Sequence, residues 1–293
     1  MLSSPAAFVR APRCRRSASR RRRHPNCPPR TETALPGNDD LLVDHRAGGA
    51  CWITLNRPAK HNALARPLLA ALAQAVRAAA EHPQTRLIVL SGAGDRYFAA
   101  GGDLRDLAAV RDEAATLDMA QQARQALDAL RLCPVPVLAY LNGDAIGGGA
   151  ELALACDLRL QAAHARIGFI QARLAITSAW GGGTDLCRLL GGARALRMMA
   201  RSEMIDAGQA LAWGLADAVI ADGPDGADLQ AFLRPMLACP PQVLRGIKAQ
   251  TLAWRQGAAY ETARATEQQQ LLHTWLHDDH WRASDQVLSK GKQ

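Results

Sequence analysis

The organisation of this chain is clearest in residues 134–157, which read Pro-Val-Pro-Val-Leu-Ala-Tyr-Leu-Asn-Gly-Asp-Ala-Ile-Gly-Gly-Gly-Ala-Glu-Leu-Ala-Leu-Ala-Cys-Asp. The apolar run that ends at Leu141 predicts a buried strand, and the Ala/Leu-rich run from Glu151 predicts a helix. Between them lies a glycine-rich turn, where backbone without Cβ atoms lets a ligand approach the main chain closely. Because the first amides of a helix are unpaired and carry partial positive charge, this turn is a candidate anion site.

A second turn of the same kind lies at residues 97–104, which read Tyr-Phe-Ala-Ala-Gly-Gly-Asp-Leu. It follows a predicted strand that ends near Leu90 and precedes a helical segment. Either turn alone is more often a simple turn than a binding site. A phosphate loop or a dinucleotide site is not indicated, because Gly-x-x-x-x-Gly-Lys-Ser/Thr is missing and the run 147–149 lacks the order Gly-x-Gly-x-x-Gly. The presence of two such turns is what a functional explanation has to account for.

Strands alternate with helices outward from these turns, which predicts an α/β fold with functional loops at the strand ends. From residue 228 onward the strand signal fades and only helical spacing remains. We therefore expect a disordered basic segment at 1–38, a core domain at 39–227 and a helical C-terminal region at 228–293 that serves in oligomerisation. The predicted strands are 41–43, 51–55, 86–90, 135–141 and 158–160. The predicted helices are 65–81, 113–131, 149–156, 181–190, 193–200, 206–213, 228–238, 241–255, 258–274 and 279–289.

The composition is that of a globular protein with a large core, because the chain has 293 residues of which 48% are hydrophobic. Its formal charge of +8 arises at residues 1–30, which hold nine arginines and no acid; outside them 26 basic side chains face 27 acidic ones. The nearly neutral remainder argues against a nucleic-acid partner. The seven cysteines include no close pair, which argues against a disulfide framework or a zinc site.

The basic segment lacks any apolar periodicity and is expected to be disordered. Three interpretations stay open: a transit peptide, a basic arm for RNA or anionic surfaces, or residues translated upstream of the true start, of which the last is favoured. No apolar run reaches the length of a membrane span. We expect a cytoplasmic protein, or one of an organelle matrix if residues 1–38 are a transit peptide.

Both glycine turns resemble signatures of the crotonase, or enoyl-CoA hydratase/isomerase, superfamily. Phe98-Ala-Ala-Gly-Gly-Asp-Leu104 resembles the first signature, and residues 134–157 resemble the second almost position by position. Further matches are Leu55-Asn-Arg-Pro-Ala-Lys-His-Asn-Ala-Leu64, Trp180-Gly-Gly-Gly-Thr184 and Ala210-Leu-Ala-Trp-Gly-Leu-Ala-Asp217. The resemblance spans about residues 40–290. It implies a spiral of ββα units with a helical C-terminal region, assembled in relatives as a homotrimer or a dimer of trimers.

The resemblance also implies an acyl-CoA substrate, with coenzyme A arriving as part of it and with no metal or other cofactor. The main-chain N–H groups of Gly102 and Gly148 would donate to the thioester oxygen, and Glu151 would move protons at the adjacent carbon. An isolated glutamate in a first helical turn more often only complements the helix dipole, and it is the signature that assigns this one to catalysis. The residues implied for substrate and coenzyme A contacts are Ala59, Lys60, Ala100, Asp103, Leu104, Gly147 and Trp180.

Gln171 departs from the family pattern. Hydratases of the family carry a second glutamate in a segment that resembles Phe-Gly-x-Pro-Glu-x-x-Leu-Gly, and residues 167–175 place Gln171 there. Because an amide cannot act as a general base near neutral pH, two-glutamate addition of water is in doubt. A single carboxylate still suits double-bond isomerisation, or decarboxylation of ethylmalonyl- or methylmalonyl-CoA, since the segment around Trp180 resembles the ethylmalonyl-CoA decarboxylase-like branch. A non-catalytic protein that binds CoA or RNA is a further alternative.

Three other groups are weaker candidates. Arg173 could bind a substrate carboxylate, and Lys248 could bind a phosphate, although Lys60 is preferred for that contact. Even Lys60 is nearly as often a solvated loop residue. The cluster 275–281, with two histidines and two aspartates, is interpreted as a helix boundary, because adjacent residues on one helix point in different directions.

Overall fold

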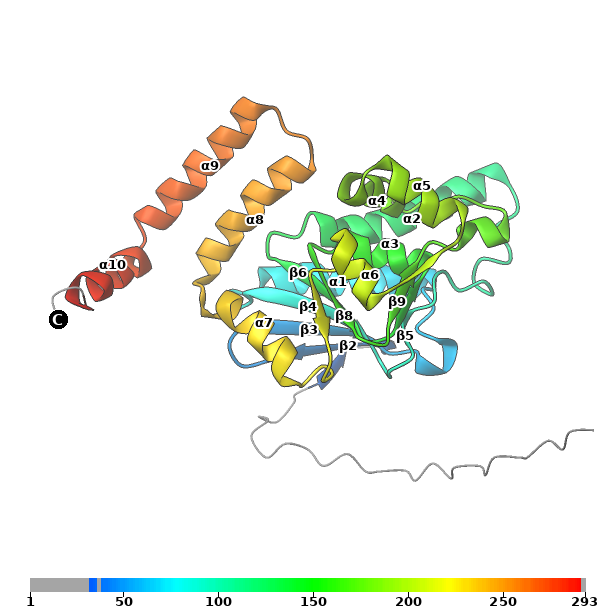
Figure 1. Cartoon of the computed structure of the whole chain (residues 1–293), viewed down its shortest axis with the longest axis horizontal. Coiled ribbons are helices and arrows are strands. Elements are labelled where there is room, and N and C mark those ends of the chain that lie inside the picture. The colour runs from blue at the N-terminus through cyan, green and yellow to red at the C-terminus, as the bar shows by residue number, and fades with distance from the viewer. Residues whose placement is uncertain (1–31, 36–37, 291–293) are drawn as a thin grey trace, which may run out of the picture.

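The computed structural model describes residues 32–35 and 38–290, which form two sheets, a surrounding set of helices and a helical C-terminal extension (Figure 1). The larger sheet has the strand order β1-β2-β3-β4-β6-β8-β11, and the smaller sheet has the order β10-β9-β7-β5. The larger sheet comprises β1 (Glu32–Leu35), β2 (Asn38–His45), β3 (Ala50–Leu55), β4 (Leu87–Gly92), β6 (Val137–Leu141), β8 (Leu158–Ala162) and β11 (Ala218–Ile220). The smaller sheet comprises β5 (Tyr97–Ala99), β7 (Asp144–Ile146), β9 (Arg166–Gly168) and β10 (Met204–Asp206).

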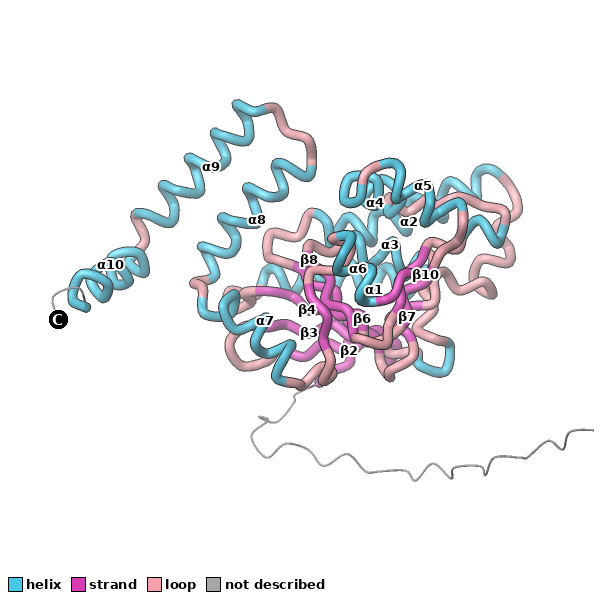
Figure 2. The backbone as a smooth tube through the Cα atoms, in the orientation of Figure 1, coloured by secondary structure: helices cyan, strands magenta, loops and turns pink. Residues whose placement is uncertain are grey.

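The helices lie around and between the sheets (Figure 2). Those of the core are η1 (Pro58–Lys60), α1 (Arg66–Glu81), α2 (Glu113–Arg131), α3 (Gly148–Ala155), η2 (Gln171–Leu174), α4 (Gly182–Leu190), α5 (Gly192–Ala200) and α6 (Ala207–Trp213). Those of the C-terminal region are α7 (Ala227–Ala238), α8 (Pro241–Arg255), α9 (Tyr260–Trp275) and α10 (Asp278–Lys290). The predicted α/β class with a helical C-terminal region is confirmed.

The chain repeats one unit: a strand of the larger sheet, a short strand of the smaller sheet, then a helix. This order recurs as β4-β5-α2, β6-β7-α3 and β8-β9-α4. The larger sheet is parallel from β3 to β11, and β5, β7 and β9 are also parallel to one another. Because parallel strands end at the same edge of a sheet, the turns that follow β5 and β7 lie side by side. The expected spiral of ββα units is therefore present.

Burial explains why these segments fold as they do. Strands β4 and β6 are buried along their whole length, as expected for parallel strands covered on both faces. One face packs against α1, α2 and α3 in the main core. The other face of the larger sheet, with Trp52 of β3 and Tyr140 of β6, packs against Leu229 and Leu233 of α7. Helix α2 begins at a side-chain cap, in which Asp112 accepts a hydrogen bond of 2.8 Å from the Ala115 N–H.

The C-terminal extension differs from the core in its exposure. Helix α9 packs back along α8, and α9 and α10 contain no buried residue (Figure 1). Large apolar side chains of this region are exposed, among them Trp254, Leu272, Trp275, Leu276 and Val287. The oligomerisation role expected for residues 228–293 stays a prediction, which this exposure favours. No helix in the described part of the chain combines the length and hydropathy needed to cross a membrane.

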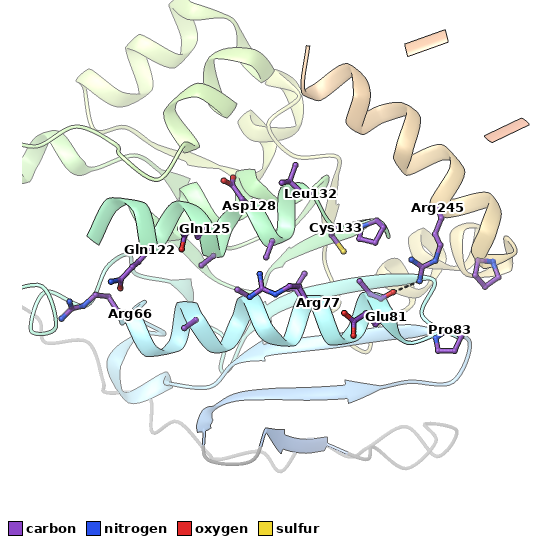
Figure 3. A pocket seen from close by; sticks show the side chains of 18 of the residues that line it. Arg66, Arg77, Glu81, Pro83, Gln122, Gln125, Asp128, Leu132, Cys133 and Arg245 are labelled. Carbon is purple, nitrogen blue, oxygen red and sulfur yellow. Dashed lines mark hydrogen bonds between the residues drawn. The ribbon is translucent and has the colours of Figure 1, made fainter. Parts of the chain in front are cut away.

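A cavity of about 1300 Å³ lies between α1, α2 and the start of α8 (Figure 3). Small residues such as Ala73 and Ala126 line it, and Arg66, Arg77 and Arg245 lie around it. Arg245 also donates a hydrogen bond of 2.7 Å to the Ala80 carbonyl, which links α8 to the end of α1. This cavity is separate from the turns that follow β5 and β7.

Three expectations from the sequence need correction. Residues 32–35 of the segment expected to be disordered form β1, because β2 offers them an antiparallel partner that composition cannot reveal; residues 1–31 lie outside the described part. The strands β5, β7, β9, β10 and β11 were not predicted, because three residues are too few for a periodic pattern. The turn at 97–104 does not lead directly into a helix, since a run of turns separates it from α2.

Candidate active site

The two glycine turns meet at one edge of the smaller sheet. Strands β5 and β7 pair in parallel, with Tyr97 opposite Asp144 and Ala99 opposite Ala145. A Cβ atom added to Gly101 would lie 3.3 Å from the main-chain nitrogen of Gly148. Gly101 also has φ +97°, a conformation that side chains other than glycine rarely adopt. The turns are thus in direct contact, and glycine is required where they meet.

Each turn leaves one main-chain donor free. Gly148 is the first residue of α3, so its N–H has no partner within the helix. Gly102 and Leu64 form an isolated parallel β-bridge. The two hydrogen bonds of this bridge run from Leu64 N to Gly101 O at 2.8 Å and from Asp103 N to Leu64 O at 3.1 Å, so neither uses the N–H of Gly102. Within the described chain, neither the Gly102 N–H nor the Gly148 N–H donates a hydrogen bond. Only the second of these donors belongs to a helix terminus, contrary to the expectation for the first turn.

The indole ring of Trp180 lies against both turns. Its Cη2 atom is 3.5 Å from the position of a Cβ on Gly102 and 2.8 Å from that of a Cβ on Gly148. The Cζ3 atom would be 2.4 Å from the second of these Cβ positions, so no larger residue fits at 148 without displacing the ring. Trp180 is only 7% exposed. The structure therefore places this predicted contact residue inside the site, as a wall beside the two free N–H groups.

Glu151 lies on the first turn of α3 and is buried, with 2% of its surface exposed. Its Oε1 accepts a hydrogen bond of 3.0 Å from Gln171 Nε2. Its Oε2 accepts two main-chain hydrogen bonds, from Trp180 N at 2.9 Å and from Gly182 N at 3.0 Å. Burial raises the pKa of Glu151 above its ordinary value, although these three hydrogen bonds and one from the Ala179 main chain act in the opposite direction. All of these donors are electrically neutral.

Gln171 contacts Glu151, as its place in the sequence pattern implied. Its second polar atom, Oε1, is buried and accepts no hydrogen bond from any described residue. Gln171 also lines a cavity of about 560 Å³ between η2, α4 and α5, together with apolar residues such as Phe169 and Met199. Because an unpaired buried acceptor costs free energy, this amide oxygen is suited to receive a donor from a bound molecule.

Five of the residues predicted to contact substrate or coenzyme A lie on two adjoining loops, at 59–60 and 100–104. Ala59 and Lys60 lie on the exposed η1 turn, and Ala100 N donates to His61 O at 3.0 Å, which joins that turn to the first glycine turn. Leu104 is 65% exposed. Gly147, at φ +56°, is the N-cap of α3.

Asp103 is less available than its neighbours on these loops. Arg57 Nη2 contacts its carboxylate at 3.0 Å. Burial alone would raise the pKa of Asp103, but the hydrogen bond and charge of Arg57 hold it below the ordinary value. The side chain of Asp103 therefore holds the loop in place. Its main chain is engaged as well, because Asp103 N donates to Leu64 O at 3.1 Å and Asp103 O accepts from Leu107 N at 3.0 Å.

Two buried residues that position these loops were not identified from the sequence as functional. Asn62 donates to Tyr97 O at 2.8 Å and to Ala93 O at 3.1 Å, and it accepts a hydrogen bond of 3.0 Å from Arg57 N. Arg57 additionally donates to Ala63 O at 2.6 Å. Both lie in segment 55–64, which resembles the crotonase superfamily. That resemblance was the sequence feature that could have identified them.

Two weaker candidates are not at the site. The ammonium of Lys248 is buried and paired with Asp157, so it is not free to bind a phosphate. Arg173 donates a hydrogen bond of 2.8 Å to Ser202 O and lines a different surface depression from the cavity beside Gln171. Sequence proximity to the site was misleading for Arg173, because η2 turns its side chain towards β10.

Comparison with known proteins agrees with this geometry. Residues 45–292 match the pattern of the family described as Enoyl-CoA hydratase/isomerase. The chain is 36% identical over 185 residues to a Bacillus subtilis protein described as an enoyl-CoA hydratase/isomerase, which covers 62% of this chain and 70% of that protein. It is 29% identical over 223 residues to ethylmalonyl-CoA decarboxylase of Mus musculus, covering 75% of this chain and 68% of that one.

Solved structures give the same result for the fold. The crystal structure of enoyl-CoA hydratase from Bacillus anthracis matches with a TM-score of 0.77 and 28% identity, covering 86% of this chain and 96% of that chain. The residues matched by the family include both glycine turns and the helix that carries Glu151. The chain therefore belongs to the enoyl-CoA hydratase/isomerase family and has the crotonase fold.

Proposed function

We propose that this chain transforms an acyl-CoA thioester through an enolate, with Glu151 as its single proton-transferring carboxylate. The observation that carries the proposal is the buried Glu151, held by neutral donors beside two turns that each offer a free N–H. These N–H groups, on Gly102 and Gly148, would donate to the thioester oxygen as it gains charge. One such donor is typically worth about 3 to 4 kcal/mol in the transition state.

The two oxygens of Glu151 have different roles in this proposal. Oε2 accepts two main-chain hydrogen bonds, which fix the carboxyl group in place. Oε1 accepts the hydrogen bond from Gln171 and, as a carboxylate oxygen with two lone pairs, can also take a substrate proton. The raised pKa of Glu151 brings its two protonation states closer in free energy near neutral pH, as a group that both accepts and returns a proton requires.

Isomerisation of a double bond fits one carboxylate. Glu151 takes a proton from C2 of a 3-enoyl thioester, and the electron pair of the broken C–H bond moves into the enolate held by Gly102 and Gly148. The same carboxyl group then returns the proton to C4, giving the 2-enoyl thioester. Addition of water would need a second general base, which the amide of Gln171 cannot supply.

Decarboxylation of a branched malonyl-CoA, such as ethylmalonyl- or methylmalonyl-CoA, is the second candidate. The bond between C2 and the free carboxylate breaks, carbon dioxide leaves, and its bonding pair forms the same enolate. Protonated Glu151 then donates to C2. The similarity to mouse ethylmalonyl-CoA decarboxylase supports this candidate, as does the amide of Gln171 in contact with Glu151, where hydratases of the family carry a second glutamate.

The test is a substrate panel with the purified protein. Crotonyl-CoA reports hydration, 3-hexenoyl-CoA reports isomerisation, and ethylmalonyl- and methylmalonyl-CoA report release of carbon dioxide. We expect turnover of a 3-enoyl or malonyl-type substrate that far exceeds hydration of crotonyl-CoA. Binding of these thioesters without turnover of any of them would refute the proposal and favour a non-catalytic CoA-binding protein.

A further inference from the structure

Helix α2 presents two arginines to the segment 179–182 that holds Glu151. Arg124 Nε donates a hydrogen bond of 2.8 Å to Ala179 O, and Arg131 Nη2 donates one of 2.9 Å to Trp180 O. The two arginines are seven residues apart, about two helical turns, so they lie on the same face of α2. We call Arg124 and Arg131 the arginine clamp.

The clamp acts on two successive peptide groups of the segment that holds Glu151. The peptide group between Ala179 and Trp180 is held at both ends, because Arg124 binds its oxygen and Glu151 accepts from its N–H. The next oxygen, that of Trp180, is bound by Arg131, and one residue further Gly182 N again donates to Glu151. A charged donor on a carbonyl oxygen fixes the peptide plane, so Arg124 orients the Trp180 N–H directly. Arg131 fixes the 180–181 peptide group, which lies between the two N–H groups that donate to Glu151.

Arg131 is itself fixed by two carboxylates. Its Nε contacts Asp185 at 2.8 Å and its Nη1 contacts Asp128 at 2.8 Å. Asp185 also pairs with Arg255 of α8 at 3.3 Å, and Arg255 donates to the carbonyls of Leu154 at 2.8 Å and of Ala155 at 3.1 Å. These contacts connect the clamp to the end of α3, the helix that carries Glu151.

The backbone between the N–H groups of Trp180 and Gly182 has a conformation that admits the guanidinium of Arg131. Gly181 has φ +93°, and a Cβ there would lie 2.8 Å from Arg131 Nη2. Only glycine lets the segment adopt this conformation and lets the guanidinium approach so closely. The same segment places the Trp180 ring against Gly102 and Gly148.

We propose that Arg131, assisted by Arg124, is a positioning residue for the proposed enolate chemistry. It holds residues 179–182 so that two N–H groups aim at Glu151 Oε2 and the Trp180 ring stays beside the free N–H groups of the glycine turns. This inference rests on the proposed function. Its consequence is specific: hydrogen bonds to the ionised form lower a carboxyl pKa, so loosening the segment raises the pKa of Glu151 further.

The test compares Arg131→Met, Arg131→Lys and Arg124→Met with the wild type on the best acyl-CoA of the panel. Arg131→Met should lower kcat about 10- to 100-fold with KM less affected, because a small misplacement of a reacting group is costly. The acid limb of its kcat/KM profile should move to higher pH. Arg131→Lys should recover part of the loss, because an ammonium can reach the carbonyl without matching the carboxylates. Arg124→Met should act in the same direction but less.

The matched control is Arg197→Met, which removes an exposed arginine side chain of α5 that pairs with Glu203. It should leave both kcat and the pH profile unchanged. An Arg131→Met protein with the wild-type profile would overturn the inference. If that variant does not fold, Asp185→Asn decides, because it keeps Arg131 and weakens its anchor; a smaller shift in the same direction supports the clamp, and an unchanged profile overturns it.

A readout without turnover separates this inference from the proposed function. Carbon-13 NMR of labelled glutamate carboxyls, with Glu151 assigned through Glu151→Gln, follows the titration of that group directly. A higher Glu151 pKa in the Arg131 and Asp185 variants supports the clamp even if no acyl-CoA in the panel is turned over. An unshifted titration refutes the clamp even if the wild type is active.

Discussion

Two kinds of carboxylate lie around α3, and their partners differ. Glu151 is held by two main-chain N–H groups and the Gln171 amide, and no described cationic side chain forms an ion pair with it. Asp185 is held by Arg131 and Arg255, and Asp157 by Lys248 and Arg255. Ion pairs fix Asp185 and Asp157 in place, which suits a positioning role. Glu151 has only neutral donors in a buried site and a raised pKa, which suits proton transfer.

Replacing the neutral-donor carboxylate should have the largest effect. Glu151→Gln is expected to lower kcat/KM about 10²- to 10⁴-fold, because an amide keeps the shape of the group but cannot transfer a proton. Steady-state kinetics on the best acyl-CoA measure this loss. Near wild-type turnover by this variant would show that Glu151 is not the proton-transferring group and does not differ in function from the cation-paired carboxylates.

The same substitution, Glu151→Gln, should lower activity but raise stability relative to the wild type as pH rises. The folded-state pKa of Glu151 is raised, so the folded protein binds this proton more tightly than the unfolded chain does. Its favourable contribution is therefore present at acid pH and lost as pH rises through the folded-state pKa. Thermal unfolding at about pH 5 and about pH 8 should show Glu151→Gln gaining relative to the wild type at the higher pH. A gain confined to the lower pH would contradict the sign of this shift.

The glycine turn that faces Glu151 comes next. Gly148→Ala puts a Cβ 2.4 Å from the Trp180 ring, which displaces the ring or the turn and misaligns one N–H donor. We expect kcat/KM to fall about 10²- to 10³-fold. Gly192→Ala is the matched control, since its Cβ meets no atom within 4 Å, and it should be as active as the wild type. Equal activity of both variants would show that the turn is only structural.

The cation-paired site should respond in stability instead of turnover. Asp157→Ala leaves the buried Lys248 ammonium without its carboxylate, and the free energy of unfolding should fall by about 3 kcal/mol. Urea unfolding measures this loss, and kinetics at a temperature well below the transition should show near wild-type kcat/KM. A large fall in kcat/KM with unchanged stability would mean that the two kinds of site are not functionally distinct.

The smallest effect is expected from replacing the neutral Gln171 donor beside Glu151 with a carboxylate. Gln171→Glu removes a donor from Glu151 Oε1 and places a second carboxylate within about 3 Å, and both changes raise the pKa of the pair. The acid limb of the kcat/KM profile should move to higher pH. Crotonyl-CoA should be hydrated faster than by the wild type if the missing glutamate is what limits water addition. A profile that stays in place would show that Gln171 does not act on Glu151.

The sequence predicted the parts of this site that depend on local pattern. The turns around Gly102 and Gly148, the first-turn position of Glu151 and the substitution at Gln171 all follow from short motifs. The contacts that hold Glu151 do not, because they join α3 to residues about 30 positions later in the chain. Arg131 and Lys248 show the same limit, since only packing of α2 and α8 decides which charge each arginine or lysine meets.

The central claim is that Glu151 removes a proton from the carbon next to the thioester while the two glycine N–H groups hold the enolate oxygen. Exchange of the C2 protons of an acyl-CoA in deuterated water, followed by proton NMR, measures this step before any later chemistry. The wild type should wash deuterium into C2, and Glu151→Gln should do so at least about 10²-fold more slowly. Exchange by Glu151→Gln at the wild-type rate would contradict the claim.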